Sequence, residues 1–203
     1  MPKTLNDLFE EQSLRVLYRK MHKTARARFN CAHRLRLFHT FTLWTMSGFS
    51  TGLIILAALS TYKISIAVDP STYGFLQFCL SLAILVISIL LSSANHSDRS
   101  EKMHRCALEI NALCHNILPA CKENTDTQLY EHTLAKYLNI LAAYENHLQI
   151  DFDLVKFDFP EDYSFSRWER ILIYIRYALR FWVHITLLLI LLGVFAYVIM
   201  KRG

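Results

Sequence analysis

One histidine and two aspartates have the clearest catalytic potential in this sequence. His147 and Asp151 are one helical turn apart, and Asp153 follows two residues later. A carboxylate that orients a histidine is a familiar catalytic element, but no nucleophile stands beside this pair. A membrane enzyme acting on lipid would depend on these residues alone, and we rank that hypothesis last. The spacing predicts instead a structural hydrogen bond between His147 and Asp151.

Histidines and cysteines between residues 104 and 121 are the only group with a composition typical of a zinc site. Their spacing matches no common zinc finger, and two of the cysteines also fall on an apolar seam. We therefore predict small buried thiols, and the odd total of five cysteines argues against a disulfide framework. The side chains considered as ligands were those of His104, Cys106, Cys114, His115 and Cys121.

Motifs of the common enzyme and cofactor folds are missing from the 203 residues. The sequence contains no P-loop, no Rossmann glycine pattern, no G-x-S-x-G elbow and no H-E-x-x-H. We therefore expect no enzymatic activity, and we predict no catalytic residue, no cofactor and no bound metal.

Two long uncharged segments dominate the first half of the chain, one between Arg36 and Lys63 and one between Asp69 and Asp98. Each is longer than the roughly 20 residues that a helix needs to cross a bilayer. Asp69 and Pro70 mark the turn between them, so the pair predicts a transmembrane helical hairpin. Gly48 and Gly52 form a G-x-x-x-G motif, which lets two helix backbones approach closely.

Small polar side chains recur along one face of the second segment. At 100° per residue they fall within an arc of about 60°, with Ile84 and Leu91 at its edge. A pore that closes by dewetting needs this mixture of polar and aliphatic groups. The same residues could instead pack between helices or bond to their own backbone. The predicted pore-lining residues are Gln77, Ser81, Ser88, Ser92 and Asn95, which Thr40, Ser47 and Thr51 of the first segment could complete.

The chain before the first segment predicts a basic helix over residues 4–36. Thr4 and Asp7 make a capping box, and apolar residues such as Val16, Met21 and Ala25 recur at loosely helical spacing. Nine Lys/Arg against three acids lie within residues 1–36. We interpret the basic face as a solvated membrane anchor, with a docking surface for an acidic partner as the alternative.

Beyond the second segment, which we expect to continue as helix, two apolar seams predict an antiparallel helical hairpin. Each seam has a 4, 3, 4, 3, 4 spacing, and a short polar turn lies between them. The first contains Met103, Ala107, Ile110, Cys114, Ile117 and Cys121, and the second contains Tyr130, Leu134, Tyr137, Leu141, Tyr144 and Leu148.

The last part of the chain predicts a third crossing. Pro160 breaks the preceding helix, and Ser166 with Glu169 forms a second capping box. We expect the helix that begins there to run unbroken into residues 181–200, which contain no Lys, Arg, Asp or Glu. This segment could instead re-enter or lie in the membrane interface.

The distribution of charge orients the predicted elements. Nineteen of the twenty-two Lys/Arg lie in residues 1–36 and 97–180, so both regions are expected in the cytosol. The net charge of +5 thus reflects membrane topology, and no direct nucleic-acid binding is expected. The sequence predicts an all-α membrane protein. Its five segments are a cytosolic basic helix (1–36), a transmembrane hairpin (37–97), a cytosolic helical hairpin (98–157), an acidic turn with a basic linker helix (158–180) and a third transmembrane helix (181–203).

The end of the predicted hairpin resembles a signature of the SLATT family. The similar residues are Tyr144, Glu145, Asn146, His147 and Asp151, and the resemblance covers about residues 14–157. SLATT proteins are two-helix membrane effectors of bacterial defence systems with nucleotide-sensing or reverse-transcriptase proteins. The resemblance implies a homo-oligomer in lipid at the bacterial inner membrane, which forms a pore or disrupts the membrane when a separate sensor protein of one of these types signals infection. The alternative is a non-conducting anchor that recruits a soluble enzyme.

Overall fold

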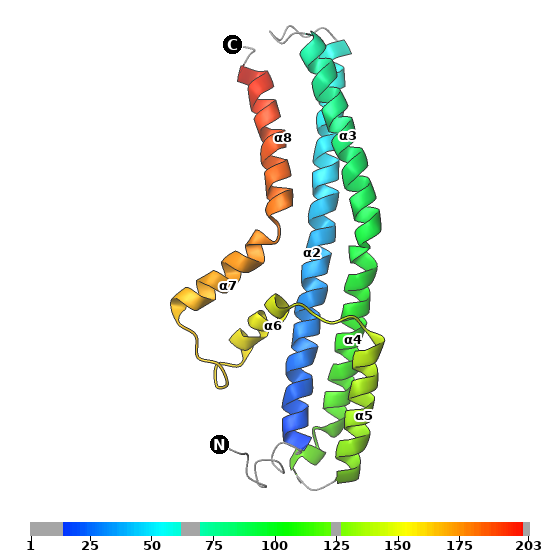
Figure 1. The fold of residues 1–203 in the computed structure, drawn as a ribbon, viewed down its shortest axis with the longest axis vertical. Coiled ribbons are helices and arrows are strands. Elements are labelled where there is room, and N and C mark those ends of the chain that lie inside the picture. Colours follow the sequence, from blue (N-terminus) through cyan, green and yellow to red (C-terminus); the bar gives the residue numbers. More distant parts are fainter. Residues whose placement is uncertain (1–13, 62–69, 123–126, 201–203) are drawn as a thin grey trace. The chain divides into compact units, whose positions relative to one another are not determined.

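The computed structural model describes residues 14–61, 70–122 and 127–200, and Figure 1 shows its order of elements. Within these ranges the chain is helical and has no strand, so the predicted all-α class is confirmed. The capping box predicted at Thr4 and Asp7 lies outside the described residues. The helices are α2 (Leu14–Thr61), α3 (Pro70–Ala94), α4 (His96–Ile117), α5 (Thr127–Ala143), α6 (Gln149–Val155), α7 (Arg167–Leu179) and α8 (Trp182–Met200), with 3-10 turns at Ala120–Lys122 and Lys156–Asp158.

The chain divides into two compact units, and α2 contributes to both. The first unit contains α2 up to Leu35 together with Ser97–Tyr174, and the second contains Arg36–His96 and the chain from Ile175. Two stretches of helix, Leu14–Leu59 and Gly74–Ile117, are long and apolar enough to cross a membrane. A third span exists if the bent pair α7 and α8 counts as one. The division into five segments stays a prediction.

A single residue interrupts the helix between α3 and α4, where an unbroken helix was expected. Asn95 has a φ of 44°, in the left-handed region. Asparagine tolerates this conformation better than most residues, and the Asn95 N–H still donates to the carbonyl of Leu91 at 3.3 Å. Asn95 therefore does not follow the 100° spacing that placed it on the predicted pore stripe.

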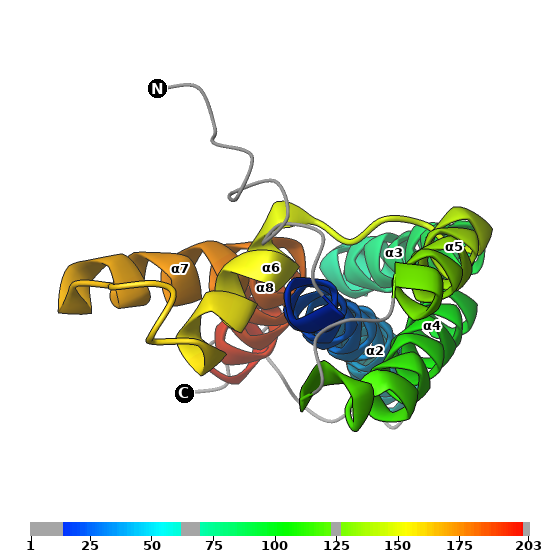
Figure 2. The same cartoon turned by 90° about the horizontal axis from the view of Figure 1, so that it is seen from below.

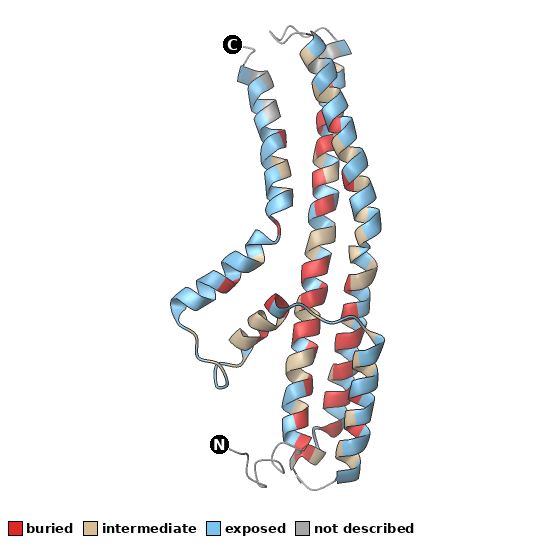
Figure 3. Cartoon of the chain, in the orientation of Figure 1, coloured by how far each residue is buried: buried red, intermediate tan, exposed pale blue. Residues whose placement is uncertain are grey.

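The core of the first unit lies between α2, α4 and α5, which Figure 2 shows end-on. All six residues of the predicted first seam are buried, and Figure 3 shows buried residues along both α2 and α4. The second seam is only partly correct. Tyr137 is buried in the core, and Tyr130, Leu134, Leu141 and Tyr144 are partly buried and pack against it. Leu148 lies beyond the end of α5 at Ala143 and is 42% exposed.

The prediction of a two-helix hairpin missed a third helix, α2, which packs in the same core. Leu14, Leu17, Met21 and Ala25 are buried in the same core as Ile110. Of the apolar positions expected on this helix, Met21 and Ala25 are buried, but Val16 is 41% exposed. The basic N-terminal helix is therefore a core element of the first unit as well as a carrier of charge.

The second unit packs the apolar parts of α2, α3 and α8 together. Phe49 and Leu56 of α2 meet Leu80 of α3 and Leu191 of α8 in one buried cluster. The Cα of Gly48 faces α8, since a Cβ placed there would lie 3.2 Å from Leu191 Cδ2. The first glycine of the G-x-x-x-G motif therefore packs against α8, and Gly52 is buried as well.

A larger residue at Gly48 should loosen the contact between α2 and α8. Gly48→Leu forces a side chain against Leu191, and overpacking of this kind costs about 1–3 kcal/mol. Gly193→Leu is the matched control, because nothing lies within 4 Å of a Cβ at that position. Cysteines at Thr42 and His184, joined by a short bismaleimide and quantified by mass spectrometry, measure the contact. We expect Gly48→Leu to lower the crosslinked fraction and Gly193→Leu to leave it unchanged. Equal yields would contradict close packing at Gly48.

The helix expected to run unbroken from residue 166 to residue 200 is broken. Its start is confirmed, since Ser166 Oγ accepts from the Glu169 N–H at 3.2 Å and Glu169 Oε2 accepts from the Ser166 N–H at 2.8 Å. However, α7 and α8 meet at an angle of 62°. The Phe181 N–H donates to the carbonyl of Ala178, which tightens the last turn of α7. The Phe181 ring also stacks on Phe38 with centroids 4.4 Å apart, which fixes the break against α2.

Candidate functional site

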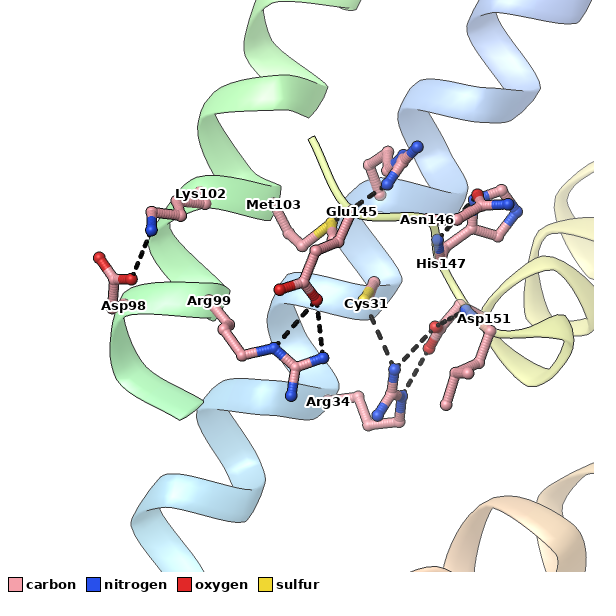
Figure 4. Close-up of polar contacts among 12 residues, drawn as sticks. Cys31, Arg34, Asp98, Arg99, Lys102, Met103, Glu145, Asn146, His147 and Asp151 are labelled. Atoms are coloured by element: carbon pink, nitrogen blue, oxygen red, sulfur yellow. Dashed lines mark hydrogen bonds and ion pairs between the residues drawn. The ribbon is translucent and has the colours of Figure 1, made fainter. Parts of the chain in front are cut away.

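The family-signature residues lie together where the chain leaves α5 and enters α6. We call residues 144–151 the signature segment. Between the end of α5 at Ala143 and the start of α6 at Gln149 the backbone is not helical, so side chains supply much of its support. Figure 4 shows the polar contacts through which this segment joins α4 and α2.

Two side chains of the signature segment bind α4. Tyr144 Oη donates to Glu109 Oε1 at 2.7 Å, and this hydrogen bond raises the pKa of the Tyr144 phenol. Arg99 donates from Nε and Nη2 to Glu145 Oε2 at 3.0 and 2.8 Å. Both sides of the Arg99–Glu145 pair are exposed, so the pair positions the segment and adds little stability.

Asp151 binds α2 through a buried ion pair. Arg34 donates from Nε to Oδ1 at 2.8 Å and from Nη2 to Oδ2 at 2.9 Å, the paired geometry that guanidinium and carboxylate groups prefer. The Asp151 side chain is fully buried and that of Arg34 is 7% exposed. Asn30 also donates to the Asp151 carbonyl at 3.1 Å. This ion pair is far more deeply buried than the Arg99–Glu145 pair.

The predicted hydrogen bond between His147 and Asp151 is wrong. Asp151 Oδ2 accepts from the Leu148 N–H at 3.0 Å and so caps α6, while Arg34 binds both carboxylate oxygens. The His147 Nδ1 is buried and has no hydrogen-bond partner among the described residues. Its backbone N–H donates to Asn146 Oδ1 at 2.9 Å. A charged partner from α2 therefore displaces the histidine from the carboxylate.

Polar side chains outside the signature segment also join α2 to α4 and α5. Thr24 Oγ1 and Tyr137 Oη lie 2.9 Å apart, and Ser100 Oγ donates to the Ala32 carbonyl at 2.7 Å. Arg28 is 2% exposed and donates from Nη1 to the sulfur of Met103 at 3.4 Å. Among the described residues no carboxylate pairs with it.

This part of the site escaped the sequence interpretation, although a signal for it exists. The buried face of α2 follows a spacing of three and four residues from residue 14 to residue 35, but polar side chains hold two of the positions. Thr24 and Arg28 interrupt the apolar pattern, so a search for hydrophobic periodicity alone does not find it. The positions are Leu14, Leu17, Met21, Thr24, Arg28, Cys31 and Leu35.

The acidic turn before α7 covers part of the basic face of α2. Lys23 Nζ lies 2.7 Å from Asp162 Oδ2, and Arg26 Nε lies 3.6 Å from Asp158 Oδ2. The hydrogen bond from Lys23 lowers the pKa of Asp162. Lys23 also lies over the ring of Tyr163 at 4.8 Å. The acidic partner of this basic face is thus a segment of the same chain.

The cysteines predicted as buried thiols are buried. All five are free, and only Cys79, on α3, is exposed. Burial raises the pKa of Cys31 to about 11 and that of Cys114 to about 11, so both thiols stay protonated at neutral pH. Within the described part of the chain, no group of three or more His, Cys, Asp or Glu side chains is placed to hold a metal ion.

The residues of the predicted pore stripe do not form the packing face of α3 within the chain. Leu80 and Ile87 are the buried residues there, whereas Ser81 and Ser92 are exposed. Ser81 Oγ donates to the Gln77 carbonyl and Ser88 Oγ to the Ile84 carbonyl, both at 2.8 Å. The residues of the first segment that could complete the lining, Thr40, Ser47 and Thr51, are exposed too. Whether the stripe lines a pore stays a prediction.

A histidine within α8 adds a polar contact that was not predicted. His184 Nε2 and Thr42 Oγ1 lie 2.8 Å apart, so the pair joins α8 to α2. Polar side chains in apolar segments are rare and often mark functional positions. The signal was available, since His184 is the only ionisable side chain other than tyrosine in residues 181–200.

The protonation of His147 should make the first unit less stable as the pH falls. Burial lowers the pKa of His147 below its ordinary value of 6.5, and the positive charge of Arg28 lowers it further. The unfolded chain therefore binds a proton first, and the free energy of unfolding declines as pH drops below about 6.5. Melting temperatures from circular dichroism at pH 7.5 and pH 5.5 measure the decline. We expect a smaller difference between the two melting temperatures for His147→Asn than for the parent protein. An equal difference would contradict a role of His147 in the pH dependence.

These features define an all-helical membrane protein whose signature segment is joined by polar contacts to two long helices, α2 and α4. The chain matches the family described as SMODS and SLOG-associating 2TM effector domain family 5 over residues 10–199, and it belongs to this family. The predicted SLATT resemblance is confirmed, and the match extends beyond residue 157 to include α7 and α8. No curated protein matches the chain. No solved structure matches it either.

Proposed function

We propose that this chain is a non-enzymatic membrane effector of a bacterial anti-phage defence system. In the proposal it oligomerises in the inner membrane, with its first unit in the cytosol, and forms a pore or disrupts the bilayer when a separate sensor protein signals infection. The family description, which names a 2TM effector domain that associates with SMODS and SLOG, supports an effector with a separate partner.

The observation that carries the proposal is the position on α2 of the Arg34–Asp151 ion pair. Arg34, which binds Asp151 of the signature segment, lies three residues before the uncharged segment that begins at Leu37. The same unbroken helix then supplies Phe49 and Leu56 to the core of the second unit. A partner that draws the signature segment away from Arg34 would separate this buried guanidinium from the Asp151 carboxylate. The free-energy cost of that separation would favour a different packing of α2.

Membrane potential is the test of the effector function. The chain is expressed in a bacterial host with its sensor partner and the stimulus, and a voltage-sensitive dye follows the potential. We expect a collapse of the potential only when chain, partner and stimulus are all present. An unchanged potential, with the partner still bound to the chain, would contradict the effector function and support the alternative, a non-conducting anchor. The occupied basic face of α2 leaves that anchor less free surface for recruitment.

Cysteine substitution tests the pore stripe separately. Ser81→Cys and Ser88→Cys, in a Cys79→Ala background, should react with a charged thiol reagent only in the activated state and then reduce conductance. Leu82→Cys is the matched control, because Leu82 is 49% exposed on α3 but lies off the stripe. Protection of both serine positions in resting and activated membranes would contradict a pore lined by this face.

A further inference from the structure

Helix α7 carries an apolar face that nothing in the described chain covers. At 100° per residue the five side chains of this face fall within an arc of about 100°. Their exposed fractions run from 47% to 79%, and Figure 3 shows most of α7 in the colour of exposed residues. The α7 apolar face consists of Trp168, Ile171, Leu172, Ile175 and Leu179.

The rest of α7 has a different composition. Residues 167–180 contain four arginines and one acid, and that acid, Glu169, is held by the Ser166 N–H as part of the helix cap. At 100° per residue Arg167 and Arg176 flank the apolar face, each about 40° beyond its edge, and Arg180 points away from it. Ile173 also points away from the apolar face and is the one buried residue of the helix. One side of the helix is thus packed against its own chain, and the apolar face is exposed.

The place of α7 in the chain determines what this face can meet. It ends at Leu179, and α8, which contains no Lys, Arg, Asp or Glu, begins at Trp182. The 62° bend between them lets α8 enter hydrocarbon without carrying the arginines of α7 along the same line. Trp168 and Trp182 are exposed at 79% and 61%, and indole rings concentrate at the membrane–water boundary.

We propose that α7 is an interfacial helix, whose apolar face enters the headgroup–acyl boundary of an anionic membrane beside the start of α8. A basic helix with a narrow apolar face and a tryptophan is typical of helices that lie in this boundary. The arginines bind anionic headgroups while the apolar face leaves water. A second copy of the chain fits less well, since it would bring like charges together. The inference requires a membrane location but not a pore.

Fluorescence of Trp168 tests the inference in the full chain. Trp44→Phe and Trp182→Phe leave Trp168 as the single tryptophan. The protein is reconstituted into phosphatidylcholine vesicles with or without phosphatidylglycerol, and the lipids are brominated near the headgroup or near the chain end. We expect loss of most of the Trp168 emission with bromine near the headgroup, and a smaller loss with bromine near the chain end. Phosphatidylglycerol should strengthen the quenching, and Arg176→Gln with Arg180→Gln should weaken that dependence.

A matched pair of variants separates lipid contact from general disturbance. Ile175→Asp places a charge in the apolar face, whereas Leu138→Asp places one at a similarly exposed position on α5. We expect Ile175→Asp to abolish the quenching and Leu138→Asp to leave it unchanged. No quenching in the parent protein would overturn the proposal. Emission that ignores bromine but changes with the protein-to-lipid ratio would overturn it too and would assign the face to a second copy. Neither result depends on the membrane-potential assay.

Discussion

Asp151→Asn should destabilise the first unit by about 3–5 kcal/mol, the usual cost of removing one partner from a buried ion pair. The variant leaves the Arg34 guanidinium 7% exposed and without its carboxylate. It also weakens the cap on the Leu148 N–H, which Asp151 Oδ2 now accepts. For a unit of this size, such a loss lowers the melting temperature by roughly 10 °C or more.

The buried cysteines provide the measurement. Cys31, Cys106, Cys114 and Cys121 all belong to the first unit and are buried, so a thiol-reactive fluorophore reports when that unit opens. A Cys79→Ala background removes the exposed thiol of α3 from the signal. Glu145→Gln is the matched control, because it neutralises a carboxylate of the same segment whose partner, Arg99, is exposed. We expect that control to cost less than about 1 kcal/mol.

A second comparison decides whether the ion pair is needed for stability or for the arrangement of the site. Replacing Arg34 and Asp151 together by Met and Leu removes both charges, and such exchanges are often neutral or stabilising. We expect this double variant to melt near the parent temperature but to lose the response to the sensor partner. If Asp151→Asn melts like the parent protein, the Arg34–Asp151 ion pair does not hold the signature segment to α2.

The periodic parts of the fold could be predicted because local spacing determines them. The α4 seam is an unbroken 4, 3, 4, 3, 4 pattern, and all six of its residues are buried. The α5 seam failed only at its end, because the helix stops at Ala143 and Leu148 lies beyond it, whereas Tyr144 still packs against the core. The bend before α8 involves neither glycine nor proline. It depends on the contact between Phe181 and Phe38, which spacing does not reveal.

The site itself could be predicted only in part. The signature residues were identified, but their partners lie far away in sequence. Arg34 and Asp151 are 117 residues apart, and Thr24 and Tyr137 are 113 apart. Local patterns carry no information about such pairs. The nearest candidate, His147, was therefore assigned to Asp151, although a guanidinium competes more strongly for a buried carboxylate.

Arg28→Met should make the first unit more stable. Arg28 is 2% exposed, its Nε has no hydrogen-bond partner within residues 14–61, 70–122 and 127–200, and its Nη1 donates to the sulfur of Met103. A buried charge costs several kcal/mol when no opposite charge compensates it. Exchange of buried ionic groups for well-packed apolar residues has stabilised proteins by about 1–4 kcal/mol, and we expect a gain in this range.

Arg26→Met is the matched control for this gain. Arg26 is an exposed arginine on the same helix, and its pairing with Asp158 at 3.6 Å contributes little. The fluorophore assay should therefore show a higher melting temperature for Arg28→Met and almost no change for Arg26→Met. A lower melting temperature for Arg28→Met would mean that the guanidinium has a compensating partner in the folded protein.

The pH dependence gives a readout that a simple gain in packing would not change. Because the charge of Arg28 helps to lower the pKa of His147, Arg28→Met should bring that pKa closer to 6.5 and reduce the loss of stability at low pH.

Local rules that a chain breaks at a cost in stability are most often broken at functional positions. We therefore expect Arg28→Met to fail in the membrane-potential assay despite its stability, because a buried charge that is kept at a cost in stability indicates a functional position. A variant that is both more stable and fully active would instead make Arg28 a purely structural residue.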